Sequence, residues 1–169
     1  GEEVNRRFDD VLYEAFNLSK LGTREIVLLG QNVNAYRSYN HNQEKVSFSD
    51  LIRHISYIDG ISRIRHTTSH PIDFSEDLIK EYKNPKLANN LHLPVQSGSD
   101  TILARMKRKH TVLEYKSIIK KIRKYRPDIH LTSDFIIGYP GETDYEFTQT
   151  MEFIAELNFS DAYSFIYSP

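Results

Sequence analysis

Four clusters of polar and glycine residues each come directly after an apolar stretch, and these residues are the best suited in the chain to bind a ligand. They occupy positions 30–34, 67–71, 96–100 and 138–142. In parallel α/β proteins the loops at the carboxyl ends of the strands meet on one face, and ligands bind there. Helix amino termini point their unpaired N–H groups to the same face, which favours carboxylates and phosphates. We therefore expect the four clusters to form one binding face.

Each cluster also has a simpler structural explanation. Residues 96–99 are compatible with an ordinary turn and helix cap, and Gly138 and Gly141 with a tight connection. His70 needs no role beyond a hydrogen bond to a backbone carbonyl, and Asn32 is of a type that tolerates left-handed loop backbone. A binding face is favoured because such clusters recur at equivalent ends of successive strands.

Hydrophobic periodicity and capping signals predict alternating helices and strands. The predicted strands span residues 25–29, 61–67, 91–95, 129–137 and 162–167, and the predicted helices span 6–21, 47–60, 75–85, 100–106, 111–126 and 143–157. Five strands separated by helices predict an α/β fold with a parallel sheet and right-handed crossovers. Periodicity alone leaves an open sheet and a barrel as alternatives. The 169 residues contain no linker, so we expect one domain over residues 1–169.

Several classes of chemistry are excluded by what the sequence lacks. It contains no cysteine, so this chain alone can build no disulfide, thiolate nucleophile, iron–sulfur site or cysteine-ligated zinc site. It also has no serine nucleophile elbow, Walker loop or His-Glu-x-x-His motif. Without these ligand motifs we expect no metal site in this chain. No apolar run approaches the ~18 residues of a membrane-spanning helix, so we also expect no membrane partner.

Positive charge is concentrated in residues 105–126. This basic segment has ten Lys and Arg residues against one acid, so it carries a net charge of +9 and the remainder carries −10. Such density is suited to contact with phosphate. The alternative is a solvated helix whose cations lie near its carboxyl end, where the helix dipole favours them.

The motifs at these positions resemble one family in the same order along the chain. They are Gly-Gln-Asn-Val-Asn-Ala-Tyr at 30–36, Thr-Ser-His-Pro at 68–71, Leu-His-Leu-Pro-Val-Gln-Ser-Gly-Ser-Asp at 91–100, Met-Lys-Arg-Lys-His-Thr at 106–111 and Ser-Asp-Phe-Ile-Ile-Gly-Tyr-Pro-Gly-Glu at 133–142. They resemble the radical-SAM methylthiotransferases, and within them the tRNA-modifying branch. The resemblance implies a partial (βα)6 TIM-like barrel of radical-SAM type. Residues 1–169 would be an incomplete core domain that lacks its first strand, its N-terminal cluster domain and its C-terminal RNA-binding domain.

The resemblance also implies an activity for the parent protein. Family members use S-adenosylmethionine (SAM) and 4Fe–4S clusters to convert N6-isopentenyladenosine beside the tRNA anticodon to its 2-methylthio form. A cluster with an open iron position binds and cleaves SAM. The parent protein is thus expected to be a cytoplasmic, monomeric transferase with tRNA as its partner.

Roles follow from the resemblance position by position. The residues expected at SAM are Glu2, Glu3, Gln96, Ser97, Ser133, Asp134, Gly138 and Gly141. The residues expected at the substrate are Gln31, Asn32, Ser69, His70 and Arg108. Glu2 or Glu3 is expected to accept from the SAM amino group, and Asp134 from its ribose hydroxyls. No catalytic residue is assigned within this chain.

The sequence departs from the family at one point that decides activity. The family holds its SAM-binding cluster with a Cys-x3-Cys-x2-Cys loop just upstream of the segment matched here by residues 1–3, and no cysteine is present. We therefore expect this chain alone to be inactive. A stand-alone SAM- or RNA-binding module remains an alternative, whereas a βα-barrel enzyme of another class is disfavoured because no nucleophile–base pair is evident.

Overall fold

The computed structural model describes residues 4–67 and 69–169, which divide into two compact units. The first unit extends to Ser69 and includes Asp73–Ala88; the second consists of His70–Ile72 and Asn89–Pro169. The expectation of a single domain over residues 1–169 stays a prediction.

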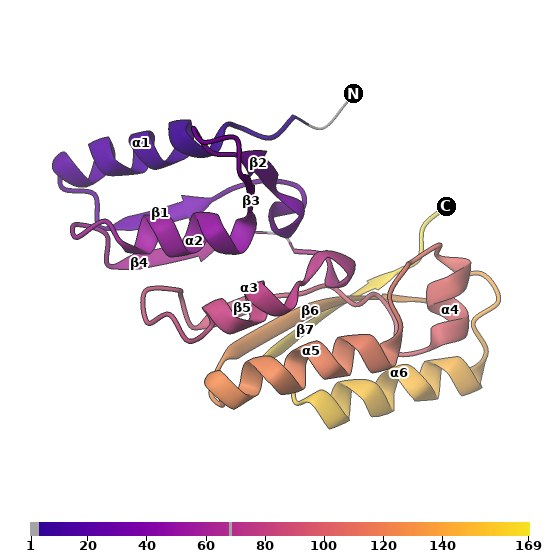
Figure 1. The fold of residues 1–169 in the computed structure, drawn as a ribbon. Helices are drawn as coiled ribbons and strands as arrows, with labels where there is room; N and C mark the ends of the chain where they lie inside the picture. The colour runs from indigo at the N-terminus through magenta and orange to yellow at the C-terminus, as the bar shows by residue number, and fades with distance from the viewer. Residues whose placement is uncertain (1–3, 68) are drawn as a thin grey trace. The chain divides into compact units, whose positions relative to one another are not determined.

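The first unit combines three helices with two small sheets (Figure 1). Its elements are α1 (Phe8–Lys20), β1 (Glu25–Leu28), η1 (Val33–Ala35), β2 (Arg37–Tyr39), β3 (Lys45–Ser47), α2 (Phe48–Ser56), β4 (Arg63–His66) and α3 (Glu76–Glu81), with η2 (Pro71–Asp73) at the junction of the units. β1 and β4 pair in parallel, as predicted. The core of this unit is formed by apolar side chains that include Phe48, Ile52, Ile55, Ile61 and Ile64.

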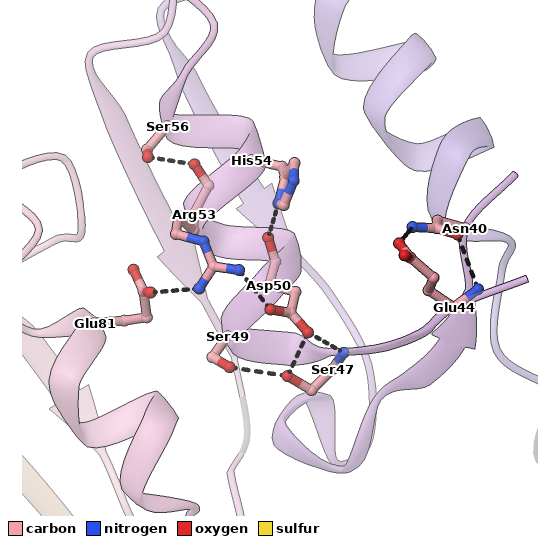
Figure 2. A network of polar contacts seen from close by, with 9 residues as sticks. All are labelled: Asn40, Glu44, Ser47, Ser49, Asp50, Arg53, His54, Ser56 and Glu81. Carbon is pink, nitrogen blue, oxygen red and sulfur yellow. Dashed lines mark hydrogen bonds and ion pairs between the residues drawn. The ribbon is translucent and has the colours of Figure 1, made fainter. Parts of the chain in front are cut away.

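The antiparallel hairpin β2–β3 was not predicted. Its turn is held by the Asn40 side chain, whose oxygen accepts from the Glu44 backbone N–H and whose amide donates to the Glu44 carboxylate (Figure 2). The same oxygen also accepts from the Asn42 backbone N–H. Gln43 takes a positive φ of 61° in this turn. Only Val46 of the two strands is buried, so the hairpin lacks the apolar alternation by which a strand is recognised.

Helix α2 begins with the capping box that the sequence predicts at Ser47 and Asp50. The Asp50 carboxylate accepts from the Ser47 backbone N–H at 2.8 Å and from Arg53 at 2.6 Å, and Arg53 also forms an ion pair with Glu81 of α3 at 3.6 Å (Figure 2). Burial raises the pKa of Asp50, but the hydrogen bonds from Ser47 and Arg53 together lower it by more. The net shift of the Asp50 pKa is therefore downward. This network joins the start of α2 to α3.

The second unit contains a three-stranded parallel sheet with the order β5–β6–β7. Its elements are β5 (Asn90–His92), α4 (Asp100–Arg105), α5 (Val112–Tyr125), β6 (His130–Ile137), α6 (Asp144–Leu157) and β7 (Asp161–Ile166). Helices α5 and α6 lie side by side along the sheet (Figure 1) and are joined by an ion pair between Lys116 and Glu156 at 2.6 Å. Both helices begin with the capping boxes that the sequence predicts, at Thr111 and Thr143.

An aromatic cluster forms the layer between this sheet and its helices. Tyr115 of α5, Phe135 of β6, Phe153 of α6 and Phe159 have ring centroids 5.6–6.3 Å apart. Burying one such side chain contributes roughly 1.5–3 kcal/mol. The Tyr115 hydroxyl donates to the Leu93 carbonyl at 2.6 Å, and burial raises the pKa of this tyrosine.

The five predicted strands are all present, but the expectation of one continuous parallel sheet is wrong for the described residues. Hydrogen bonding gives a two-stranded sheet, β1–β4, and a separate three-stranded sheet. Beyond β4 the ladder shrinks to a single bridge, in which Ile64 bonds to the backbone of Lys86 and Ala88. The chain then enters the second unit, so too few residues pair with β4 to continue the sheet.

Candidate functional site

Side chains alternate in direction along β6, which separates a packing face of its sheet from a second face. Leu131, Ser133 and Phe135 are fully buried, whereas Thr132 and Asp134 between them are only partly buried. Because neighbouring strands are in register, Thr132 lies opposite His92 of β5, and Asp134 lies opposite Tyr163 of β7. We call these four residues, His92, Thr132, Asp134 and Tyr163, the Asp134 face.

His92 connects the members of this face. Its Nδ1 lies 2.7 Å from the Thr132 hydroxyl and its Nε2 lies 3.1 Å from Asp134 Oδ2. The ring centroid of Tyr163 is 6.5 Å from that of His92. No described residue bonds to Asp134 Oδ1, so this carboxylate has one oxygen fixed from inside the fold and one available to a ligand.

Gln96 follows β5 at the same end of the sheet. Its backbone N–H donates to the Asp134 carbonyl and its carbonyl accepts from the Ile136 N–H, both at 2.9 Å. These bonds hold Gln96 at φ 77°, a left-handed conformation that costs a non-glycine residue roughly 1–2 kcal/mol. The side-chain amide of Gln96 forms no hydrogen bond to any described residue, so it too is available to a ligand.

The serines of the two motifs have partners inside the fold. Ser133 Oγ accepts from the Val95 N–H at 3.0 Å, on the face opposite Asp134. Ser97 Oγ accepts from the Ser99 N–H at 3.1 Å and lies 3.3 Å from the Thr150 hydroxyl of α6. Both serines are fully buried. They secure the strand end and its loop, and their expected contact with SAM stays a prediction.

The two glycines after β6 lie in different surroundings. Gly138 has φ +75° and no atom within 4 Å of the place where a Cβ would be, so a ligand can approach its backbone. At Gly141, also at positive φ, that place is occupied by the guanidinium of Arg105, which donates to the Gly141 carbonyl at 2.7 Å. The close approach at Gly141 is therefore to Arg105 of α4. Glu142 closes the turn by accepting from the Gly138 N–H at 2.9 Å.

Three of the expected substrate residues lie in the first unit, at the carboxyl ends of β1 and β4. The two loops meet where the Gly30 N–H approaches the Thr67 hydroxyl at 3.3 Å. Gln31 is exposed, and Asn32 donates to the Asp73 carboxylate at 2.7 Å while its own side-chain oxygen is buried without a partner among the described residues. Ser69 is fully buried, with its hydroxyl 3.3 Å from His66 Nδ1.

The other two expected substrate residues, His70 and Arg108, belong to the second unit. Both lie near His110, whose Nε2 is 3.0 Å from the Val95 carbonyl. Burial lowers the pKa of His110, the bond with Val95 opposes this, and Arg108 and His70 lower it further. Glu2 and Glu3, expected at the SAM amino group, lie outside the described residues.

The sequence reasoning missed His92, Thr132 and Tyr163. A signal was present for the first two, because alternation along Leu91–His92–Leu93 and Leu131–Thr132–Ser133 separates them from the apolar face. Tyr163 lies on a strand with every residue exposed, so alternation gives no direction there.

The described residues show neither a metal centre nor a membrane-spanning helix. They contain no group of three or more His, Asp or Glu residues placed to hold a metal ion. None of their helices is long and apolar enough to cross a membrane.

Comparison with known proteins assigns the class. The sequence profile of the radical SAM superfamily matches residues 1–154, so the chain belongs to this superfamily. A solved structure, that of the radical SAM enzyme coproporphyrinogen III oxidase from Escherichia coli, aligns with a TM-score of 0.64 at 18% identity. The alignment covers 99% of this chain and 39% of the oxidase chain. At this level of identity it supports the fold alone.

Sequence relatives narrow the similarity within the superfamily. The chain is 58% identical over 170 residues to the tRNA-2-methylthio-N(6)-dimethylallyladenosine synthase of Photobacterium profundum and 60% identical over 169 residues to that of Serratia proteamaculans. The resemblance to tRNA methylthiotransferases is thereby confirmed. The chain spans 36% of the length of each relative, so it corresponds to about a third of such an enzyme.

Proposed function

We propose that the second unit binds SAM at the carboxyl ends of β5 and β6. The observation that carries this is the fixed carboxylate of Asp134, with one oxygen unused, beside the unpaired Gln96 amide. A carboxylate suits the ribose hydroxyls, an amide suits the SAM carboxylate or ribose, and the open backbone at Gly138 suits adenine or ribose. Glu2 or Glu3 would accept from the amino group. Bound SAM supplies the methyl group and the radical source of the reaction.

The parent protein is proposed to be a tRNA methylthiotransferase that converts N6-isopentenyladenosine beside the anticodon to its 2-methylthio derivative. The support is the similarity to synthases of that modification over the whole of this chain. We propose that the chain forms part of a partial (βα)6 barrel and a single core domain. A tRNA substrate would place the parent protein in the cytoplasm, where we expect it to act as a monomer.

The residues of this chain do not fit the 4Fe–4S clusters. Such clusters are held by cysteine thiolates, and the chain contains none. Their ligands would have to come from other parts of the parent protein. The contribution of this chain is therefore to bind and orient SAM and substrate, and by itself it should be inactive.

The SAM site is tested by Asp134→Asn in the full-length, cluster-loaded protein. The amide keeps the shape of the side chain but removes a charged acceptor, and hydrogen bonds to charged groups contribute about 1.5–3 kcal/mol. We expect roughly 10-fold or greater loss of SAM affinity in isothermal titration. Asp128→Asn, at an exposed carboxylate just before β6, is the matched control and should bind normally. Equal affinity of the two variants would refute the site.

On the substrate side we propose Gln31, Asn32, Ser69, His70 and Arg108. Arg108 lies in a turn with Lys107 and Lys109, and all three are exposed and form no side-chain bond to described residues. The turn is held to the end of α4, because the N–H groups of residues 107 and 108 donate to carbonyls of that helix. We propose that these cations contact tRNA phosphates.

Other cations of the basic segment are held within the fold. Arg105 bonds to Gly141, Lys116 pairs with Glu156, Arg123 donates to the Leu157 carbonyl, and Arg126 bonds to Asn89. Lys120 and Lys124, exposed further along α5, provide a matched pair for comparison.

The same cations distinguish the stand-alone RNA-binding module from the enzyme. If Lys107 and Lys109 each contact a phosphate, K107Q/K109Q should reduce the dependence of log affinity on log salt by about 1.4–1.8. K120Q/K124Q should leave it unchanged in the same fluorescence assay with unmodified tRNA. Salt-dependent tRNA binding by the chain alone would favour the module. Binding confined to the full-length protein would favour the enzyme, and equal slopes for both variants would exclude the turn as the contact.

A further inference from the structure

The position of His92 raises the question of what holds the Asp134 carboxylate in place. His92 lies opposite Thr132 in the register of β5 and β6, and its ring reaches diagonally to Asp134, two residues further along β6. Thr132 and Asp134 are two residues apart on one strand, so their side chains share the face of the sheet from which His92 also projects. The ring therefore spans the gap between two side chains of β6, with one nitrogen on each.

Stability does not explain this arrangement. The side chains of His92 and Asp134 are 36% and 28% exposed, and even a charged pair at such positions contributes little to folding because water screens it. The aromatic cluster that holds the sheet to its helices lies on the opposite face, around Phe135. A pair that adds little stability but fixes two rotamers is better explained by a need for a fixed acceptor.

For a neutral imidazole, the hydrogen-bonding capacities of the three groups define one consistent arrangement. An ionised carboxylate only accepts, so His92 Nε2 must donate to Asp134 Oδ2. In the neutral imidazole Nδ1 is then an acceptor, and the Thr132 hydroxyl donates to it. Thr132 thereby sets the tautomer of His92, and His92 sets the rotation of the Asp134 carboxylate.

We propose that His92 is a positioning residue for SAM, which orients Asp134 so that Oδ1 faces the ribose hydroxyls. This rests on the proposed SAM site. His92 acts through Asp134 and occupies Oδ2, so a hydroxyl can bond only to the remaining oxygen, whose direction is fixed. Without His92 the carboxylate rotates about its terminal bond, and a bound ribose must order it.

The test measures hydroxyl selectivity, which general damage to the fold does not change. The probes are S-adenosylhomocysteine and its 2′-deoxy and 3′-deoxy forms, titrated into the full-length, cluster-loaded protein. For each deoxy probe, its dissociation constant is divided by that of S-adenosylhomocysteine. The readout is the larger of these two ratios, one for the 2′-deoxy and one for the 3′-deoxy form. A hydrogen bond to a charged acceptor should make this ratio roughly 10 or more in the wild type.

Three substitutions of His92 separate positioning from packing. His92→Leu removes both nitrogens, and we expect the ratio to fall at least threefold. His92→Gln places an amide N–H near the position of Nε2 and should restore the wild-type ratio. His92→Asn reaches only as far as Nδ1, so it should behave like the leucine variant. If the leucine variant fails to fold, the comparison of Gln with Asn decides the question.

The outcomes keep the two proposals apart. A wild-type ratio near 1, or an unchanged ratio in Asp134→Asn, would show that Asp134 does not receive the ribose, and the role of His92 would fall with it. A high wild-type ratio that is lost in Asp134→Asn but retained in both His92→Leu and His92→Asn would leave the SAM site intact and overturn the positioning role. If His92→Leu and His92→Asn bind all three probes more weakly by the same factor, the ratio is unchanged and the positioning role is likewise overturned.

Discussion

Gly98 lies in the Gln-Ser-Gly-Ser loop, and its substitution by alanine tests whether this loop is fixed by close packing against α6. A Cβ at Gly98 would lie 2.7 Å from both Thr150 Cα and Phe153 Cβ and 3.0 Å from the Gln149 carbonyl oxygen. These atoms belong to the helix backbone or its first side-chain carbon, so no rotamer change relieves the contact. The loop and α6 would have to move apart.

The cost of that movement follows from its parts. Overpacking in a well-packed core costs about 1–3 kcal/mol. Separation of the loop from α6 also breaks the hydrogen bond from the Gly98 N–H to the Thr150 hydroxyl, at 3.0 Å, which contributes about 0.5–1.5 kcal/mol. Together these parts give about 1.5–4.5 kcal/mol, and we take the middle of that range, roughly 2–4 kcal/mol, as the expected destabilisation by Gly98→Ala. For a cooperative unit of 150–250 residues that lowers the melting temperature by about 4–16 °C.

Thermal unfolding followed by far-ultraviolet circular dichroism measures this effect, and Gly138→Ala is the control. A Cβ at Gly138 meets no atom, so only its positive φ opposes substitution, at roughly 1–2 kcal/mol. We expect the Gly98 variant to melt lower than the Gly138 variant, and the Gly138 variant to lose more SAM affinity when both are folded. If Gly98→Ala melts like the wild type, the close packing of loop and helix is refuted.

Three further predictions concern other parts of the chain. Asp50→Asn should cost about 1 kcal/mol in urea unfolding because it weakens the α2 capping box, whereas the same change at exposed Asp59 should be neutral. Burial lowers the pKa of His66, and the hydrogen bond with the Thr67 backbone only partly opposes that shift. As pH falls, the unfolded chain therefore binds the proton before the folded protein does. The free energy of unfolding should accordingly fall as pH drops below about 6.5. His66→Gln should flatten that dependence, and an equal slope would contradict it. The isolated chain should bind SAM more weakly in isothermal titration than the cluster-loaded parent protein, and equal affinity would contradict the missing cluster anchor.

The sequence predicted the elements of the fold where local signals are strong. The capping boxes at Thr111 and Thr143 marked the start of α5 and α6 correctly, because both depend on residues three apart. The β2–β3 hairpin escaped notice because its turn depends on one polar side chain, Asn40, rather than on apolar alternation. The separation of the sheets was also missed, since strand order depends on long-range pairing.

At the candidate site, the motifs predicted which strand ends carry polar residues but not the direction of each side chain. Asp134 and Gln96 have groups available to a ligand, whereas Ser97 and Ser133 point into the fold. For Ser133 the signal was present, because Leu131 and Phe135, two residues away on either side, are apolar and share its face. The role of His92 depends on the register between β5 and β6, which one sequence does not reveal.

The geometry of the candidate site depends on backbone bonds more than on side-chain contacts. Gln96 is joined to β6 by two peptide hydrogen bonds, one of them to the carbonyl of Asp134 itself. The backbone of Gln96 and that of Asp134 are therefore fixed relative to each other by the sheet, and the strained φ of Gln96 persists because both bonds require it. A ligand that bonds to Asp134 would meet an acceptor already held by His92, so little of its binding energy would be spent on ordering that carboxylate. The same reasoning explains why Ser133 is buried: by accepting from Val95 it holds the end of β5 against β6, one residue before the Gln96 bonds begin.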